Sequence, residues 1–167
     1  MLNYPGVPWV IKHAWSLTAL VVVYNTVLVA TVLELFFVKR PLHTGLSLCG
    51  LLVFIFSFLL RSWSVKTLGI FHSTNIEIKP DHRLITRGPY NYIRHPYYLS
   101  VMMEVLSIPV TVNCLYTVWL AVMLYVPCVL VRVYLEEQVF SRTFGEEFSR
   151  YKAAVRAFIP VRGLKEM

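Results

Sequence analysis

The densest group of polar and aromatic side chains lies between residues 82 and 98, in the run HRLITRGPYNYIRHPYY. This run holds two of the five histidines, four of the ten tyrosines and three arginines, and the chain is strongly apolar on both sides of it. Ionisable groups are costly between membrane-like segments. We therefore expect the run to bind a ligand or to lie at a membrane interface.

The end of this run can start a helix. Pro96 suits a first helical turn, because the N–H that proline lacks would have no partner there. The other N–H groups of such a terminus favour an anion, for example a carboxylate. His95 and Tyr98 can add side-chain hydrogen bonds, although His95 alone could equally be a structural cap or a buried hydrogen-bonding group. Tyr90 follows a Gly-Pro pair, which is typical of a turn.

A second charged group follows a long apolar stretch downstream. Arg132 would lie at the interface, where its guanidinium matches the geometry of a carboxylate; alternatively, it marks the end of a span by snorkelling. Glu136 lies one helical turn further on, on the same face. It can hold an ammonium or hydroxyl group, or it can pair with Arg132. Glu137 points elsewhere, so we expect it to be a surface charge.

The order and spacing of these two groups form a pattern that covers roughly the C-terminal half of the chain. The first block is G-P-Y-x-Y-x-R-H-P-x-Y. The second is Arg132-x-x-x-Glu136-Glu137, followed by Phe144-Gly145-Glu146-Glu147-Phe148, Tyr151 and Pro160. The pair resembles the signature of the isoprenylcysteine carboxyl methyltransferase family, which also has phospholipid methyltransferase relatives.

The resemblance implies an S-adenosylmethionine-dependent enzyme that methylates the carboxylate of a lipid-modified, prenylcysteine-like substrate entering from the membrane. It implies that Arg132 is the catalytic and substrate-binding residue, and that backbone and apolar side chains of residues 82–85 surround the adenine. The cofactor-binding residues that it implies are Asn75, His82, Arg83, Leu84, Ile85, Tyr90, His95, Pro96, Tyr97, Tyr98 and Glu136.

Methylation of a carboxylate requires little proton transfer by the protein. A carboxylate is ionised at neutral pH, since its reference pKa is about 4, and it needs no general base. The enzyme must mainly align the reacting groups and exclude water. The lack of a Ser-His-Asp arrangement or of a G-x-G-x-x-G motif is therefore no objection.

Two alternatives remain open. A related enzyme could methylate a phospholipid amine or a small lipophilic acid; an amine must lose a proton, and Glu104 or His82 could serve as the base. A non-enzymatic membrane protein could instead use the polar run as a lipid-headgroup site. We expect no metal, because the histidines lack ligand spacing and the cysteines lie far from them.

The composition is that of a membrane protein. Apolar residues make up 57% of the chain, the mean hydropathy is +0.60, and charged residues make up only 15%, against about 25% in soluble domains. The net charge of +7 is better explained by anionic lipid headgroups than by nucleic acid, because the bases cluster beside apolar segments.

The apolar runs predict an all-α integral membrane protein with about four transmembrane helices, since about 20 residues cross a bilayer core. The last two form a helical hairpin, and an amphipathic cytosolic helix follows over residues 132–151. The predicted spans are Ala14–Val38, Gly45–Leu60 with an extension to about Val65, Tyr97–Val112 and Leu115–Tyr134.

Four polar residues interrupt the predicted spans. We expect Asn25 to hydrogen-bond a neighbouring helix and Glu34 to reach the interface. Arg61 can snorkel to the headgroups. Glu104 should face the bundle interior, either as a helix–helix hydrogen-bonding group or as part of the site.

We expect one membrane-embedded domain over residues 1–167. Its parts are two spans (1–65), a cytosolic cofactor loop (66–95) with a short extended piece near residues 74–78, the hairpin (96–134) and a C-terminal cytosolic segment (135–167). Most basic residues fall on the side of the loop and the C-terminal segment. The multi-pass protein should therefore present its site to the cytosol, from the endoplasmic reticulum in a eukaryote or the inner membrane in a prokaryote.

Overall fold

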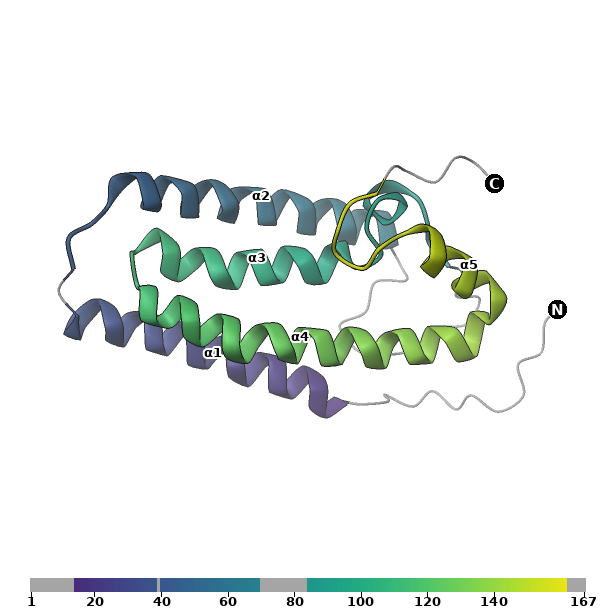
Figure 1. Cartoon of the computed structure of the whole chain (residues 1–167), viewed down its shortest axis with the longest axis horizontal. Helices are drawn as coiled ribbons and strands as arrows, with labels where there is room; N and C mark the ends of the chain where they lie inside the picture. Colours follow the sequence, from purple (N-terminus) through teal and green to yellow (C-terminus); the bar gives the residue numbers. More distant parts are fainter. Residues whose placement is uncertain (1–13, 39, 70–83, 162–167) are drawn as a thin grey trace.

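Helices make up most of the described chain, which comprises residues 14–38, 40–69 and 84–161 of the computed structural model (Figure 1). Over these residues no strand occurs, and the predicted all-α class is confirmed. The expected extended piece near residues 74–78 lies outside the described residues. The elements in chain order are α1 (Ala14–Phe37), α2 (Thr44–Leu68), the 3-10 helix η2 (Gly88–Asn91), α3 (Pro96–Thr111), α4 (Leu115–Phe144) and α5 (Glu146–Ala154).

The described residues contain three helices that are long and apolar enough to cross a membrane, namely α1, α2 and α4. The helix α3 has 16 residues, fewer than the roughly 20 that cross a bilayer core. The predicted count of about four spans is therefore not confirmed, since three of the described helices have spanning length. The predicted hairpin is present as α3 and α4, but its second arm runs to Phe144 instead of Tyr134.

The helix α3 joins two pairs of helices. The helix α2 packs mainly on α3, α1 packs mainly on α4, and α3 and α4 pack on each other. The start of α1, the end of α2, the start of α3 and the end of α4 lie at one end of the bundle, together with α5 (Figure 1). The two sequence blocks are therefore carried to the same end.

Small side chains let α2 and α3 approach closely. Gly50, Ser57 and Ser64 recur every seven residues along α2 and are buried, and Ser100 and Ser107 are buried on α3. Small residues at such a seam allow close backbone packing in an apolar environment. The other faces of α2 expose large apolar side chains, as a lipid-facing helix should.

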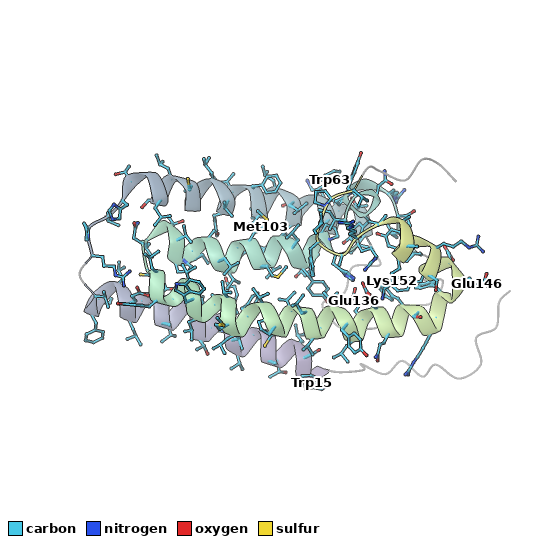
Figure 2. All side chains as sticks on the ribbon, viewed as in Figure 1. Trp15, Trp63, Met103, Glu136, Glu146 and Lys152 are labelled. Carbon is cyan, nitrogen blue, oxygen red and sulfur yellow. The ribbon has the colours of Figure 1, made fainter. Side chains whose placement is uncertain are left out.

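Two exposed tryptophans lie toward one end of the bundle, whereas the exposed Trp119 lies near the start of α4. Trp15 on α1 and Trp63 on α2 lie toward the same end as Glu136 (Figure 2). Tryptophan is enriched at membrane–water interfaces, so this level fits an interface.

Glu34 ties the end of α1 to the start of α4. It accepts hydrogen bonds from the backbone N–H groups of Tyr116 (3.1 Å) and Thr117 (2.7 Å), and from the Thr117 hydroxyl (2.8 Å). Its side chain is buried at this contact, so Glu34 pairs with α4, a partner that we did not expect. The first N–H groups of a helix lack internal partners, and a carboxylate also suits the positive end of the helix dipole.

Two further expectations about polar residues are corrected. Asn25 does not bond a neighbouring helix; its Nδ2 donates to the carbonyl of Val21 on its own helix (2.7 Å). Arg61 does not simply extend to headgroups, since its Nη1 lies 2.6 Å from Glu104 Oε2 on α3. A carboxylate in an apolar bundle is stabilised by such a partner, so Glu104 serves as a helix–helix pairing group.

The close approach of α2 and α3 at Gly50 gives a first prediction. A Cβ at Gly50 would lie 2.6 Å from Oγ1, 2.7 Å from N and 2.9 Å from Cα of Thr111, whereas a Cβ at Gly45 on the same helix would meet nothing within 4 Å. Gly50→Ala should therefore push α2 from α3 and destabilise the protein by about 1–3 kcal/mol. Thermal unfolding in detergent measures this, with Gly45→Ala as the matched control. Equal midpoints for the two variants would contradict the contact.

Candidate active site

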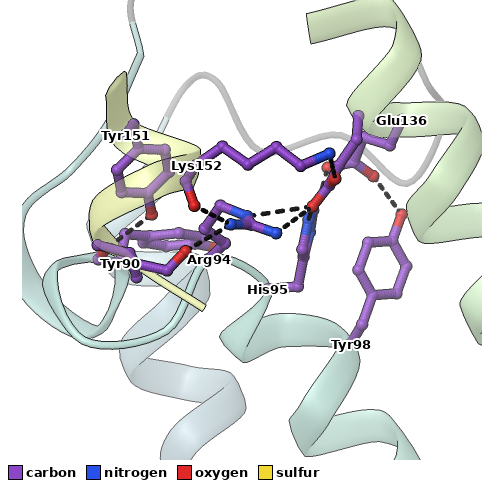
Figure 3. Close-up of polar contacts among 9 residues, drawn as sticks. Tyr90, Arg94, His95, Tyr98, Glu136, Tyr151 and Lys152 are labelled. Carbon is purple, nitrogen blue, oxygen red and sulfur yellow. Dashed lines mark hydrogen bonds and ion pairs between the residues drawn. The ribbon is translucent and has the colours of Figure 1, made fainter. Parts of the chain in front are cut away.

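The two sequence blocks meet where α3 begins and α4 nears its end (Figure 3). The Tyr98 hydroxyl donates to Glu136 Oε2 at 2.5 Å. The His95 Nδ1 lies 4.0 Å from Glu136 Oε1, and its Nε2 lies 3.1 Å from Glu137 Oε1. Residues some forty positions apart in sequence thus share one small site.

Local structure explains why these side chains face α4. Pro96 opens α3, and the first hydrogen bond of that helix runs from the Leu99 N–H to the His95 carbonyl. His95 and Tyr98 are three residues apart, so both project from one side of the first turn. The His95 side chain is buried between α4 and the ring of Phe158, whose centroid lies 6.2 Å away.

Arg132 joins the site through Tyr98. Its Nε donates to the Tyr98 hydroxyl at 3.1 Å, and its Nη1 donates to Ser16 Oγ on α1 at 2.7 Å. Arg132 is only 2% exposed, so it does not snorkel to the headgroups. A desolvated guanidinium attracts an anion more strongly than one in water does. The arrangement can therefore bind a carboxylate.

Glu137 is not the surface charge that we expected. Its Oε1 accepts from Arg94 Nε (3.1 Å) and Arg94 Nη2 (2.8 Å) and faces His95 Nε2 (3.1 Å), while its Oε2 lies 2.8 Å from Lys152 Nζ. Its side chain is 12% exposed. The correction has a physical reason: cations from two other segments converge on this turn of α4 and compensate its burial.

Arg94 also fixes the segment that follows α5, residues 155–161, here called the strap. Its Nη1 donates to the carbonyls of Lys152 (2.8 Å) and Val155 (2.5 Å). Backbone bonds continue the attachment, from the N–H groups of residues 94, 95 and 161 to the carbonyls of residues 156, 157 and 92, respectively. The strap is therefore held against the start of α3.

A buried aromatic cluster holds α5 in place. Tyr151 donates through its hydroxyl to the Tyr90 carbonyl at 2.6 Å. Burial raises the pKa of the Tyr151 phenol above its usual range, so it stays protonated and can donate. Burial, and then the charge of Glu136, likewise raise the pKa of Tyr90. Tyr151 packs with Phe148 and Leu84.

The amphipathic helix predicted over residues 132–151 is divided. Its expected apolar face is present, since Phe140 and Phe144 pack against the buried cluster of Phe148 and Tyr151. However, α4 ends at Phe144, and Gly145 has a φ of 53°. A left-handed conformation suits glycine and lets the chain turn into α5.

The predicted cofactor set is only partly described. Tyr97 and Tyr98 form an edge-to-face pair with centroids 5.8 Å apart, Pro96 is buried, and Ile85 is half-buried. Asn75, His82 and Arg83 lie outside the described residues. Within the described ranges no group of three or more histidine, cysteine, aspartate or glutamate side chains could hold a metal.

Sequence reasoning missed several residues that surround the site. Ser16 and Phe158 carry no motif, and they reach the site only through helix packing and through the strap. Lys152 looked like an ordinary charge on an amphipathic helix, and only its position one turn beyond Phe148 hinted that it could face α4.

The anchoring of the strap gives a second prediction. Arg94→Ala should destabilise the protein by about 3–5 kcal/mol, because Glu137 and two carbonyls lose a buried partner. Arg150→Ala is the control, since its 3.5 Å pair with Glu146 is exposed and worth at most about 1 kcal/mol. Hydrogen exchange of residues 155–161 and the unfolding midpoint measure the effect. Unchanged protection in Arg94→Ala would contradict the anchoring.

Comparison with known proteins gives a consistent result. The model of the isoprenylcysteine carboxyl methyltransferase (ICMT) family matches residues 49–142. A protein-S-isoprenylcysteine O-methyltransferase of Tribolium castaneum is 29% identical over 144 residues, covering 78% of this chain and 50% of its own length. The Homo sapiens protein of the same name is 31% identical over 147 residues, which cover 81% of this chain and 49% of the human protein.

A solved structure agrees with the sequence comparison. The eukaryotic intramembrane Ras methyltransferase ICMT matches with a TM-score of 0.68 and 26% identity, over 93% of this chain and 56% of that one. The chain spans about half the length of the curated relatives that it matches. The family model covers more than half of the chain, and the chain therefore belongs to the isoprenylcysteine carboxyl methyltransferase family.

Proposed function

We propose that this protein is an S-adenosylmethionine-dependent carboxyl methyltransferase whose acceptor is a lipid-modified, prenylcysteine-like carboxylate. One observation carries the proposal: His95 and Tyr98 from α3 meet Glu136 from α4, with Arg132 hydrogen-bonded to the same tyrosine, at the end of an apolar bundle. The names of the Tribolium and human relatives support the choice of acceptor.

The residues at the start of α3 suit this methyl donor. The donor carries an ammonium group, which donates hydrogen bonds. His95 Nδ1 and Glu136 Oε1 lie 4.0 Å apart, and we propose that both accept from this group. When bound, S-adenosylmethionine supplies a methyl group activated by its sulfonium sulfur. We propose that Tyr90, Pro96 and Tyr97 complete this side of the site. The further contacts proposed by resemblance are Asn75, His82, Arg83, Leu84 and Ile85.

Arg132 is the proposed partner of the acceptor. Its guanidinium can pair with a carboxylate through two parallel hydrogen bonds. Ser16 Oγ, at 2.7 Å from Nη1, marks a position where an acceptor oxygen could sit. Buried apolar neighbours such as Val129 and Val133 exclude water. The protein's role is then to hold the ionised carboxylate in line with the methyl group of the donor, shielded from water.

The proposed site faces the cytosol. Its end of the bundle carries the exposed cations Lys66, Arg87, Arg142, Arg150, Lys152 and Arg156, whereas Arg40 lies at the other end. Basic residues are enriched on the cytosolic side of membrane proteins. A lipid-anchored acceptor would then present its polar end at the level of Arg132 while its tail stays in the bilayer.

The structure disfavours Glu104 as the base of an amine methyltransferase. A general base must be able to take up a proton, but Glu104 lies 2.6 Å from Arg61 and its side chain is only 13% exposed. Glu104 is thus already engaged as the partner of Arg61 across the α2–α3 seam. A carboxylate acceptor, which needs no base, suits the described residues better.

A labelling experiment tests the function. Purified protein in lipid vesicles is given S-adenosylmethionine with a radiolabelled methyl group and, separately, a farnesylcysteine analogue, phosphatidylethanolamine or a fatty acid. We expect label on the farnesylcysteine analogue that mild base releases, because a methyl ester is base-labile. Base-stable label on phosphatidylethanolamine, or no transfer to any acceptor, would refute the proposal.

Arg132→Ala separates acceptor binding from donor binding. The variant removes the charged partner of the acceptor carboxylate. We therefore expect kcat/KM to fall about 10- to 100-fold, the usual range for the loss of a charged hydrogen bond. Calorimetric affinity for S-adenosylhomocysteine should change only a few-fold, since Tyr98 still bonds Glu136. Arg142→Ala, an exposed arginine of the same helix, is the control. Unchanged kinetics in Arg132→Ala would remove this residue from the mechanism.

A further inference from the structure

Glu137 has more polar partners than its place outside the expected cofactor set would suggest. Arg94 approaches it with two nitrogens, Lys152 with one and His95 with one, all within 3.1 Å. Two cations are sufficient to compensate one buried carboxylate. The contact with His95 therefore calls for a separate explanation.

The contact determines which imidazole nitrogen carries the proton. His95 Nε2 faces an ionised carboxylate oxygen at 3.1 Å, and such an oxygen can only accept. In a neutral imidazole the proton must then lie on Nε2, which leaves the lone pair on Nδ1.

A second carboxylate lies near His95 Nδ1. Glu136 Oε1 lies 4.0 Å from it, which is too long for a hydrogen bond between the two atoms. The other oxygen of Glu136, Oε2, is held by the Tyr98 hydroxyl at 2.5 Å, and this fixes the carboxylate. Two acceptors so spaced suit one nitrogen that donates to both at about 2.7–3.2 Å.

We propose that Glu137 is a positioning residue, which holds His95 as the Nε2–H tautomer so that Nδ1 and Glu136 Oε1 form a seat for the ammonium group of the methyl donor. This inference rests on the proposed function and makes it more specific, because it names His95 Nδ1 and Glu136 Oε1 as the two atoms that bind the ammonium group of the donor. An ammonium group has three N–H donors and no acceptor, so it complements a seat made only of acceptors.

The opposite tautomer would spoil the seat. With the proton on Nδ1, His95 would present a donor to the ammonium group, and one of the two hydrogen bonds would be replaced by repulsion. Glu137→Gln removes the charge with little change in shape, and its amide can turn an N–H toward Nε2. That amide then stabilises the wrong tautomer.

Calorimetry in detergent compares S-adenosylhomocysteine with its deamino analogue, which lacks only the ammonium group. The unmodified protein should bind the deamino analogue roughly tenfold or more weakly, as for a lost charged hydrogen bond. Glu137→Gln and Glu136→Gln should each abolish most of this difference by weakening only S-adenosylhomocysteine. Lys152→Met is the matched control: it removes a Glu137 partner that is 54% exposed without touching the imidazole, and it should retain the difference.

The possible failures are distinguishable. If the unmodified protein binds neither ligand, the proposed function itself fails. If the unmodified protein binds S-adenosylhomocysteine and its deamino analogue equally well, the donor site stands and the ammonium seat is overturned. The same holds if Glu137→Gln still binds S-adenosylhomocysteine more tightly than the deamino analogue. If Lys152→Met reproduces Glu137→Gln, Glu137 acts only by holding α5 against α4, and the positioning role is overturned.

Nitrogen NMR of ¹⁵N-histidine-labelled protein tests the tautomer in the unmodified protein. The His95 signals, identified by their loss in His95→Gln, should show a protonated Nε2 and an unprotonated Nδ1 near neutral pH. Adding S-adenosylhomocysteine should shift the Nδ1 signal, and the deamino analogue should not. A proton on Nδ1, or an Nδ1 signal indifferent to the ligand, overturns the inference.

Discussion

An ionised carboxylate inside an apolar bundle must be paired, and this constraint organises the protein. Glu34 accepts the first N–H groups of α4, Glu104 pairs with Arg61 across the α2–α3 seam, and Glu137 gathers cations at the start of α3. Each carboxylate joins segments that are far apart in sequence. Apolar burial in lipid gives little preference between helix partners, so these polar contacts fix which helices lie together.

The same constraint explains how rigidity is distributed around the site. Glu136 is held through one oxygen by Tyr98, and Tyr98 is held by Arg132, which also bonds α1. His95, Tyr98, Arg132 and Glu136 are therefore each oriented by at least one neighbour. Binding groups that are already oriented lose little conformational freedom when a ligand arrives.

Much of the fold could be predicted from the sequence. The first predicted span, 14–38, differs from α1 by one residue at its end, because a long, predominantly apolar run has few other ways to satisfy its backbone in a membrane. The proximity of His95 to Glu136 was also predicted, since two motifs with a shared chemistry need a common place. Most errors concerned partners: Asn25, Glu34 and Glu137 have local sequence surroundings that do not reveal which helix will face them. Gly145 divided a continuous apolar pattern by adopting a positive φ.

The strap makes the order of assembly matter. Residues 155–161 hydrogen-bond the backbone at His95, yet they are synthesised after all four bundle helices. A nascent chain can therefore insert and pack its membrane helices while one wall of its site is still missing. The apolar helices can therefore pack before the strap completes the end of the bundle that carries the candidate site. The proposed ligand site is the last part of the fold to be finished.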